Sequence, residues 1–471
     1  MILLTPFLSS VAAYGTKTDS YDDFRREILK SPEAVELWTR MDVLLVEEAS
    51  MLAGECTSYV FRFSAEVRPA NVPPLRMILC GDLFQLGPIL RKSKGRGAWK
   101  AFDASEHDFF FECPEWEQLK FRVIILRKSF RHRDPLFEFV NEEVRRGEVS
   151  IETARMLELL EEVDRIESVG GSADWTVLFG TNSESDRYNE MKLRSIDGEH
   201  MDFYCSDRRS SSPGVNNAAV QSFFRNCQGK KLVRLKVGCK IVVLKNLHQR
   251  SGIVNGASGH VVRFDYGSSK AGSTRRLYPV CRIRGLDTRA VLEDPDYDPK
   301  TSAFEVLPEG RHDEVLFKHA DWTLKSSDGS SFPETLATRS CVPIKLAYSV
   351  TGHKSQGMGI EPVVADLSHV FEYGQAYAMI SRGTSFRTTK IKNFRRNKCL
   401  AHPAVKEFYA RYESTERSRE EILHLVEMKR LRAAMILSLK EKLKRSEDSN
   451  KRRRLLGGPA PAGFVSAADL L

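Results

Sequence analysis

Two adjacent carboxylates, Glu47 and Glu48, directly follow the apolar run Val43–Val46. A short continuous apolar run is typical of a buried parallel strand, and open α/β sheets bind ligands beyond the carboxyl ends of such strands. One carboxylate could hold Mg²⁺ through water, while the other could orient or deprotonate an attacking water. Two solvated acids at the end of a strand remain the alternative.

A second strand is predicted at Arg76–Cys80, and Gly81, Asp82 and Gln85 follow it. Because parallel strands end at the same edge of a sheet, Asp82 and Gln85 should lie near Glu48. A glutamine in this place can sense a γ-phosphate by hydrogen bonding, whereas a carboxylate would repel it. The two strand ends together predict a site that handles phosphate.

Two arginines stand where they could meet the charge of a γ-phosphate. Arg131 precedes a stretch with helical spacing at 137–144, and Arg382 follows a short helical pattern at 374–380. The second pattern comes after an apolar strand at 362–365. Because an arginine after a helix is more often a solvated surface residue, the order of the motifs has to decide between the two readings.

Composition excludes several classes of protein. A chain of 471 residues with 41% hydrophobic content predicts two to four domains with real cores. The pI near 9.0 favours an acidic partner, nucleic acid first. Nine cysteines without a CxxC pair argue against zinc and disulfide frameworks and fit a reducing compartment. The sequence has no apolar run long enough for a bilayer and no basic region typical of a signal peptide.

The order of the motifs resembles the Pif/RecD family of superfamily 1B DNA helicases, most closely the petite-integration-frequency helicases. The resemblance runs from about Thr5 to Tyr412. VLLVEEASML is similar to the family's Walker B segment, and GDLFQLGPI to its Gly-Asp-x-x-Gln-Leu-Pro-Pro motif. Three further segments carry the resemblance: LRKSFRHRDPLFEFVNEEVRRG, LVRLKVGCKIVVLKNLHQRSGIVNGASGHVV, and KLAYSVTGHKSQGM with FEYGQAYAMISR.

The resemblance implies a role for each matching position. Glu48 is the water-activating carboxylate, and Glu47 stands at the position of the Mg²⁺-linked acid. Gln85 senses the γ-phosphate of ATP, and Arg131 and Arg382 close on it. Three more residues are expected to bind the cofactors ATP and Mg²⁺: Asp82, Gln356 and Gly357. Four residues are expected to contact nucleic acid: Asn182, Tyr348, His353 and Lys354. His132 replaces the family's usual Gln.

The implied fold class is α/β, with two RecA-like P-loop NTPase-type domains whose parallel sheets are flanked by helices. The first domain is expected to be incomplete at its N-terminus, and a small β-barrel is expected as an insertion in the second. HVVRFDY, RLYPVCRIRG and AVLEDPDY are the predicted strands of that barrel. The expected parts are a partial first domain at 1–125, a second domain at 126–256 and 343–412, the insertion at 257–342, and a charged tail, partly helical and partly disordered, at 413–471.

The implied function is ATP-dependent, 5′-to-3′ unwinding of DNA in repair, recombination, telomere or organelle-genome maintenance. Single-stranded and forked duplex DNA are the expected partners, and no membrane is expected. The basic run Lys451–Arg454 could be a nuclear import or phosphate-binding patch, while a solvated charged helix is the commoner explanation. The expected compartment is the nucleus, with the mitochondrion as the alternative.

One expected motif is missing from the sequence. No segment fits Gly-x-x-x-x-Gly-Lys-Ser/Thr, whose amides and lysine hold the β- and γ-phosphates. The chain starts at the segment that follows this motif in the family, so we expect the first strand and P-loop to be absent rather than mutated. Either the chain is a truncated helicase, or it is a paralogue that binds single-stranded nucleic acid without hydrolysis. A regulatory partner acting through the helical stretch 413–454 is the third alternative.

Overall fold

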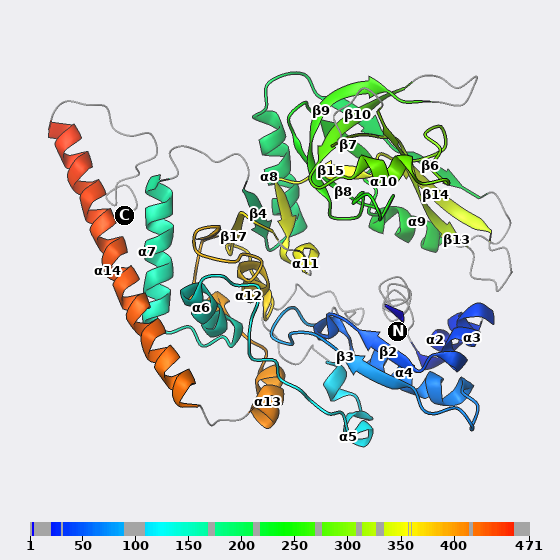
Figure 1. Ribbon diagram of the computed structural model, residues 1–471, viewed down its shortest axis with the longest axis horizontal. Coiled ribbons are helices and arrows are strands. Elements are labelled where there is room, and N and C mark those ends of the chain that lie inside the picture. Colours follow the sequence, from blue (N-terminus) through cyan, green and yellow to red (C-terminus); the bar gives the residue numbers. More distant parts are fainter. Residues whose placement is uncertain are drawn as a thin grey trace. The chain divides into compact units, whose positions relative to one another are not determined.

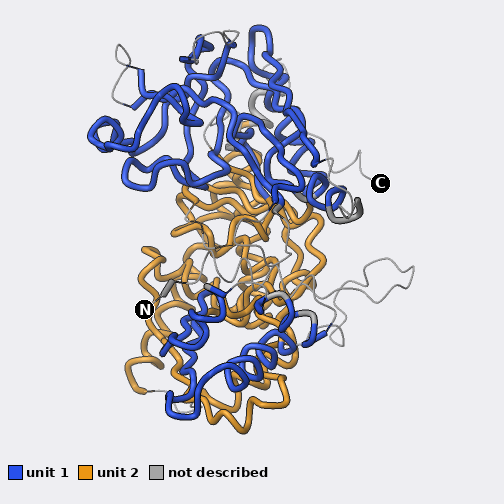
Figure 2. The backbone as a smooth tube through the Cα atoms, turned by 90° about the vertical axis from the view of Figure 1, so that its right-hand side faces the viewer, with its two compact units in different colours: residues 1–47, 54–80, 182–350 blue, residues 48–53, 81–181, 351–471 orange. Residues whose placement is uncertain are grey.

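The computed structural model divides the chain into two compact units, which Figure 2 colours blue and orange. Unit 1 comprises residues 1–47, 54–80 and 182–350, and unit 2 comprises residues 48–53, 81–181 and 351–471. These units divide the chain at other places than the predicted domains, whose boundaries stay a prediction. The structure describes residues 2–3, 20–29, 32–88, 109–167, 175–210, 217–268, 276–307, 313–325, 334–356, 358, 360–413 and 418–455. Gly357, the segment Thr5–Tyr14 and the tail from Gly457 lie outside these residues.

The N-terminal part of unit 1 contains a three-stranded sheet in the order β1–β2–β3, in which all pairs are parallel. Both predicted strands are therefore confirmed, with β2 directly before Glu47 and β3 directly before Cys80. Aromatic side chains fill the core beside them, where the rings of Trp38 and Phe63 meet edge to face at 5.3 Å. The elements are β1 (Ile2–Leu3), α2 (Tyr21–Leu29), α3 (Pro32–Arg40), β2 (Val43–Val46), α4 (Gly54–Val67) and β3 (Arg76–Leu79).

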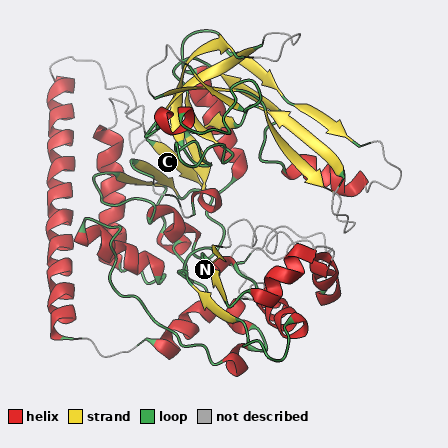
Figure 3. Cartoon of the chain, turned by 45° about the vertical axis from the view of Figure 1, so that its right-hand side comes forward, coloured by secondary structure: helices red, strands yellow, loops and turns green. Residues whose placement is uncertain are grey.

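The later part of unit 1 is rich in antiparallel strands, drawn as arrows in Figure 3. One sheet has the order β11–β12–β10–β9–β8–β15, a second has the order β13–β14–β6, and β5 pairs with β7. The elements are α8 (Asn182–Arg194), β5 (Met201–Tyr204), β6 (Ser206–Arg209), α9 (Asn217–Asn226), β7 (Leu232–Leu235), β8 (Lys240–Val243), β9 (Ser258–Tyr266), β10 (Leu277–Ile283), α10 (Thr288–Leu292), β11 (Phe304–Val306), β12 (Glu314–Phe317), β13 (Ala320–Lys325), β14 (Thr335–Cys341) and β15 (Ile344–Leu346).

Two of the three strands predicted for the insertion are confirmed. HVVRFDY and RLYPVCRIRG form β9 and β10, but the strand predicted at AVLEDPDY is wrong, because its first residues end helix α10. The Asp287 side chain accepts hydrogen bonds from the amides of Arg289 and Ala290, so it caps a helix start that the strand prediction overlooked. Within the described residues, β11 and β15 are the two edge strands of the six-stranded sheet. A closed barrel is therefore not confirmed.

Unit 2 contains the parallel strands β4, β17 and β18, and β16 joins their sheet where the chain enters the unit. Helix α14 lies alongside α7 (Figure 1), so the predicted charged tail is helical and packed over much of its length. Among the described residues, no helix is long and apolar enough to cross a membrane. The elements are α5 (Trp116–Leu119), α6 (Pro135–Arg145), α7 (Ile151–Glu167), β4 (Thr176–Phe179), β16 (Ser349–Thr351), α11 (Gly352–Ser355), β17 (Val363–Asp366), α12 (Gln375–Ile380), β18 (Thr389–Lys392), α13 (Pro403–Tyr412) and α14 (Arg419–Leu455).

Candidate phosphate-handling site in unit 2

Glu48 begins unit 2 in an unusual backbone conformation, with φ 53° and ψ 42°. Non-glycine residues adopt this left-handed region rarely, and such residues cluster at functional sites. The backbone after it runs against Gly81, where a Cβ would come within 2.8 Å of the Ala49 nitrogen. Only a glycine therefore lets the loops that carry Glu48 and Asp82 approach this closely.

Gln356 contacts the Glu48 carboxylate from the end of α11. Its Nε2 donates to Glu48 Oε2 at 3.0 Å and lies 3.5 Å from Ser50 Oγ. Its Oε1 is buried and has no hydrogen-bond partner among the described residues. Unpaired buried oxygens are costly, so this amide oxygen is suited to accept a donor that arrives with a ligand or water.

Arg382 lies at the centre of the site and is 1% exposed. Its guanidinium donates to the Ala378 carbonyl at 3.0 Å, the Gln85 side chain at 3.2 Å and the Ser355 carbonyl at 3.4 Å. All these acceptors are neutral, and no carboxylate of the described residues forms an ion pair with Arg382. Burial, and next the nearby charge of Arg131, lower the pKa of Arg382. A buried cation with incomplete compensation favours an anionic ligand.

Arg131 lies beside this cation, with Nη1 donating to the Ser381 carbonyl at 3.4 Å. Its side chain is exposed, in contrast to that of Arg382. The structure thus brings two arginines, a glutamine and a carboxylate together within unit 2, as the sequence predicted for Arg131, Arg382, Gln85 and Glu48. Their chemical roles stay predictions.

His132 follows Arg131 and is half-buried, and its Nε2 lies 3.5 Å from Asn141 Nδ2. Burial, followed by the charge of Arg131, lowers its pKa. Protonation therefore favours the unfolded chain. The stability that neutral His132 provides is complete above its ordinary pKa of about 6.5 and is lost as the pH falls below that value.

Replacing His132 by Gln is expected to flatten the acid side of the stability profile. The wild type should lose unfolding free energy relative to His132→Gln below pH ~6.5, by at most about 1.4 kcal/mol per pH unit. Thermal unfolding between pH 5 and 8 measures this difference, and His424→Gln, at an exposed position on α14, is the control. Parallel profiles for wild type and His132→Gln would contradict the prediction.

The start of α12 fixes Arg382 relative to the loop that carries Gln85. Gly374 caps this helix with φ +71°, and a Cβ there would collide with the carbonyl oxygens of Phe84 and Gln85. Gln375 is fully buried, and its Nε2 donates to the Gly180 carbonyl at 3.1 Å. The helix is therefore held both to the end of β4 and to the Gln85 loop.

Asp82 does not project freely into the site. Its carboxylate accepts hydrogen bonds from Arg145 on α6 and from the Tyr377 hydroxyl on α12. Sequence reasoning missed both partners. The sequence contains one weak signal for Arg145. This residue lies about one helical turn after Asn141, so it lies on the same face of α6, next to the buried Val140 and Val144. The predicted cofactor contact of Asp82 stays a prediction.

The four residues that are predicted to contact nucleic acid lie in different surroundings. Tyr348 is 8% exposed in a core of unit 1, and its hydroxyl accepts from the Lys240 amide at 3.0 Å. A buried ring with a satisfied hydroxyl opposes the predicted contact of Tyr348 with nucleic acid. Asn182 is exposed at the first residue of α8. In unit 2, His353 Nε2 lies 2.9 Å from Glu372 Oε2, and Lys354 is exposed.

The exposed carboxylates of Glu47 and Glu48 are oxygen donors that fit Mg²⁺, which takes one or two carboxylates with water and phosphate oxygens. No group of three or more His, Cys, Asp or Glu side chains in the described part of the chain could hold a metal ion by itself. Glu47 is therefore expected to hold Mg²⁺ through water only together with a nucleotide. Its predicted role stays a prediction.

Comparisons with known proteins show similarity to helicases. Residues 221–264 match the family model described as "DNA helicase Pif1, 2B domain". The ATP-dependent DNA helicase PIF1 of Emericella nidulans is 28% identical over 421 residues, which cover 85% of this chain and 53% of that protein. The chain thus spans about half the length of the curated relatives it matches.

Solved structures of Pif1 helicases are also similar to this chain. The crystal structure of Pif1 helicase from Candida albicans is similar with a TM-score of 0.67 and 25% identity, covering 86% of this chain and 85% of that one. Bacteroides Pif1 bound to single-stranded DNA has the same fold, with a TM-score of 0.55, 20% identity, and 81% and 78% of the two chains covered. The likeness confirms the α/β fold class with RecA-like domains. By its ordered motifs, its relatives and its fold, the chain is similar to the helicases of the Pif1 family.

Proposed function

We propose that this chain supplies the hydrolytic and DNA-tracking parts of an ATP-dependent, 5′-to-3′ DNA helicase. The observation that carries the proposal is the buried Arg382 guanidinium, which has neutral acceptors, a second cation nearby, and a carboxylate in the same site. Such a site attracts a phosphate and can act on a water next to it. Translocation on single-stranded DNA and unwinding of forked duplexes follow from the family. Nuclear or mitochondrial genome maintenance is the proposed setting.

Each side chain has a distinct part in the proposed reaction. Glu48 orients the attacking water and accepts its proton, while Gln356 holds the carboxylate in place at 3.0 Å. Arg382 and Arg131 stabilise the negative charge that builds up on the transferred phosphoryl group. Gln85 bonds Arg382 at 3.2 Å and reports whether a γ-phosphate is present. ATP with Mg²⁺ would supply the phosphoryl group and the metal charge that neutralises it.

The relatives support the substrates. The Emericella nidulans relative is named an ATP-dependent DNA helicase, and the similar Bacteroides protein was solved with single-stranded DNA. The net charge of +9 is consistent with binding to a nucleic-acid backbone. A helicase that couples ATP hydrolysis to movement along DNA is the simplest function that uses both ATP and single-stranded DNA.

The test is ATP turnover by the purified chain, measured with and without single-stranded DNA. DNA should stimulate turnover, and Glu48→Gln, which keeps the acceptor for Gln356, should lower kcat about 10²- to 10⁴-fold. Glu36→Gln is the matched control, because this carboxylate is exposed on α3. Salt-sensitive DNA binding without turnover above the Glu48→Gln background would instead identify a single-strand-binding paralogue without hydrolysis.

A further inference from the structure

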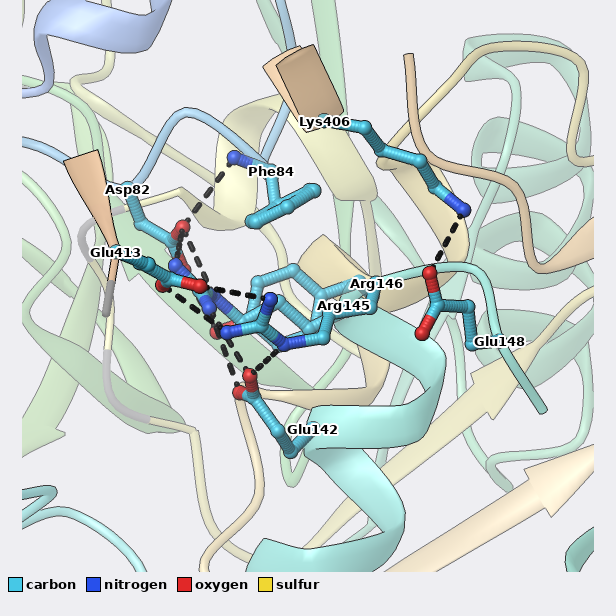
Figure 4. A network of polar contacts seen from close by, with 9 residues as sticks. Asp82, Phe84, Glu142, Arg145, Arg146, Glu148, Lys406 and Glu413 are labelled. Atoms are coloured by element: carbon cyan, nitrogen blue, oxygen red, sulfur yellow. Dashed lines mark hydrogen bonds and ion pairs between the residues drawn. The ribbon is translucent and has the colours of Figure 1, made fainter. Parts of the chain in front are cut away.

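The Asp82 carboxylate is held by donors that are distant in sequence (Figure 4). Arg145 Nε lies 3.0 Å from both carboxylate oxygens, and Arg145 Nη2 donates to Oδ1 at 2.9 Å. The Tyr377 hydroxyl donates to Oδ2 at 2.8 Å. The amide of Phe84, in the same loop as Asp82, donates to Oδ1 at 3.2 Å. With these donors in place, the carboxylate has little capacity left for a metal or nucleotide.

The surroundings make these bonds strong. The Arg145 side chain is 16% exposed, and its guanidinium lies 4.6 Å from the ring centre of Phe84 and 5.1 Å from that of Tyr409. Burial alone would lower the pKa of Arg145, but the charge and hydrogen bonds of Asp82, together with the charges of Glu142 and Tyr409, raise it above its usual range. Burial, and next the Asp82 charge, raise the pKa of Tyr377 well above its usual range. Charged bonds in such a low-dielectric place hold their geometry firmly.

Asp82 in turn fixes the loop that ends in Gln85. The Gln85 amide donates to the Asp82 carbonyl at 3.0 Å, and the Gln85 side chain accepts from Arg382 at 3.2 Å. Tyr377 and Arg382 both belong to α12 or its C-terminal end, while Arg145 belongs to α6. One carboxylate therefore ties the glutamine loop to the helix that delivers the buried arginine.

We propose that Arg145 and Tyr377 are positioning residues, which act through Asp82 to hold Gln85 against Arg382. Neither side chain needs to touch the nucleotide. The reaction they serve rests on the proposed function, whereas the positioning of the loop does not. Loss of either contact leaves Glu48 and Arg382 chemically intact but lets the glutamine move away from the arginine.

Hydrogen exchange of the Phe84 and Gln85 amides tests the positioning directly, without any catalytic activity. Tyr377→Phe removes one hydroxyl and should accelerate exchange there about tenfold. Arg145→Met should accelerate exchange at these amides about 100-fold. Arg145→Lys keeps the positive charge but lacks the planar guanidinium that donates to both carboxylate oxygens, so exchange in this variant should be slower than in Arg145→Met but faster than in the wild type. Tyr412→Phe on α13 and Arg155→Met on α7 are matched controls at more exposed positions. Tyr377→Phe keeps the test valid if Arg145→Met does not fold.

Unchanged exchange at Phe84 and Gln85 in Tyr377→Phe would overturn the proposal. Equal acceleration throughout β17 and α7 would also overturn it, because the two residues would then only stabilise unit 2. In the ATP-turnover assay, Tyr377→Phe should lower kcat about tenfold with little change in KM for ATP. A loosened loop with unchanged kcat would overturn the positioning role. If the wild type shows no turnover, the proposed function fails, while the exchange result still decides the positioning of the loop.

Discussion

Arg382→Ala is expected to lower DNA-stimulated ATP turnover about 10³-fold, because a phosphate-facing arginine stabilises charge that develops only in the transition state. Its position supports a large effect. The side chain is 1% exposed, and its hydrogen bonds go to neutral acceptors such as the Ser355 carbonyl and Gln85 Oε1. The neighbouring Arg131 is exposed and donates to the Ser381 carbonyl, so we expect it to compensate only in part.

Removing a buried arginine also removes structural hydrogen bonds, and the two effects must be separated. Alanine leaves the carbonyls of Ala378 and Ser355 without this donor, at a cost of about 1–3 kcal/mol in unfolding free energy. Arg382→Lys keeps the charge and loses the planar fork, so it should restore part of the stability and little of the turnover. The measurement is kcat for both variants beside their thermal unfolding at the same pH.

Three results would contradict this prediction. Turnover in Arg382→Ala within about tenfold of the wild type would assign the phosphate contact to Arg131 instead. A loss of turnover that follows only the loss of folded protein would make Arg382 a structural residue. If a nonhydrolysable ATP analogue binds more weakly while kcat is retained, the arginine binds ATP in the ground state and does not stabilise the transition state selectively.

The sequence predicted the elements that hold the site, because local patterns determine them. The strands β2 and β3 were expected from apolar runs, and α6 from the helical spacing of apolar residues. The residues after β2 and β3 also placed Glu48 near Gln85, and the family resemblance added Arg131 and Arg382 to the same site. Parallel strands that end at one edge bring such residues together whatever their separation along the chain.

What the sequence could not predict depends on contacts between distant segments. Asp82 meets Arg145 63 residues later and Tyr377 295 residues later, and no spacing rule relates such positions. Tyr348 was assigned to nucleic acid as an aromatic residue of its motif, but packing buries the ring in unit 1. Helix α10 stands where the apolar residues predict the start of a strand, because the Asp287 side chain caps the first amides of a helix there.

The tail helix α14 depends on one buried charge, and Arg432→Met is expected to lower the free energy of unfolding of unit 2 by about 3–5 kcal/mol. Arg432 is 7% exposed, and its Nη1 donates to Glu143 at 2.9 Å, Ser150 at 2.7 Å and Thr153 at 2.9 Å. Methionine fills the space but leaves Glu143 without its cation. Urea unfolding and protease cleavage within α14 measure the loss.

Arg430→Met is the matched control, because that side chain is 81% exposed and its change should stay within about 0.5 kcal/mol. Equal stability of the two variants would contradict the role of Arg432. Glu143 and Arg145 lie on the same helix, α6, yet Arg145 has its own partners in Asp82 and the Phe84 ring. We therefore expect Arg432→Met to release α14 while exchange at the Gln85 amide stays unchanged. That outcome would show that Arg432 holds the tail helix α14 and that Arg145 holds the Gln85 loop independently of it.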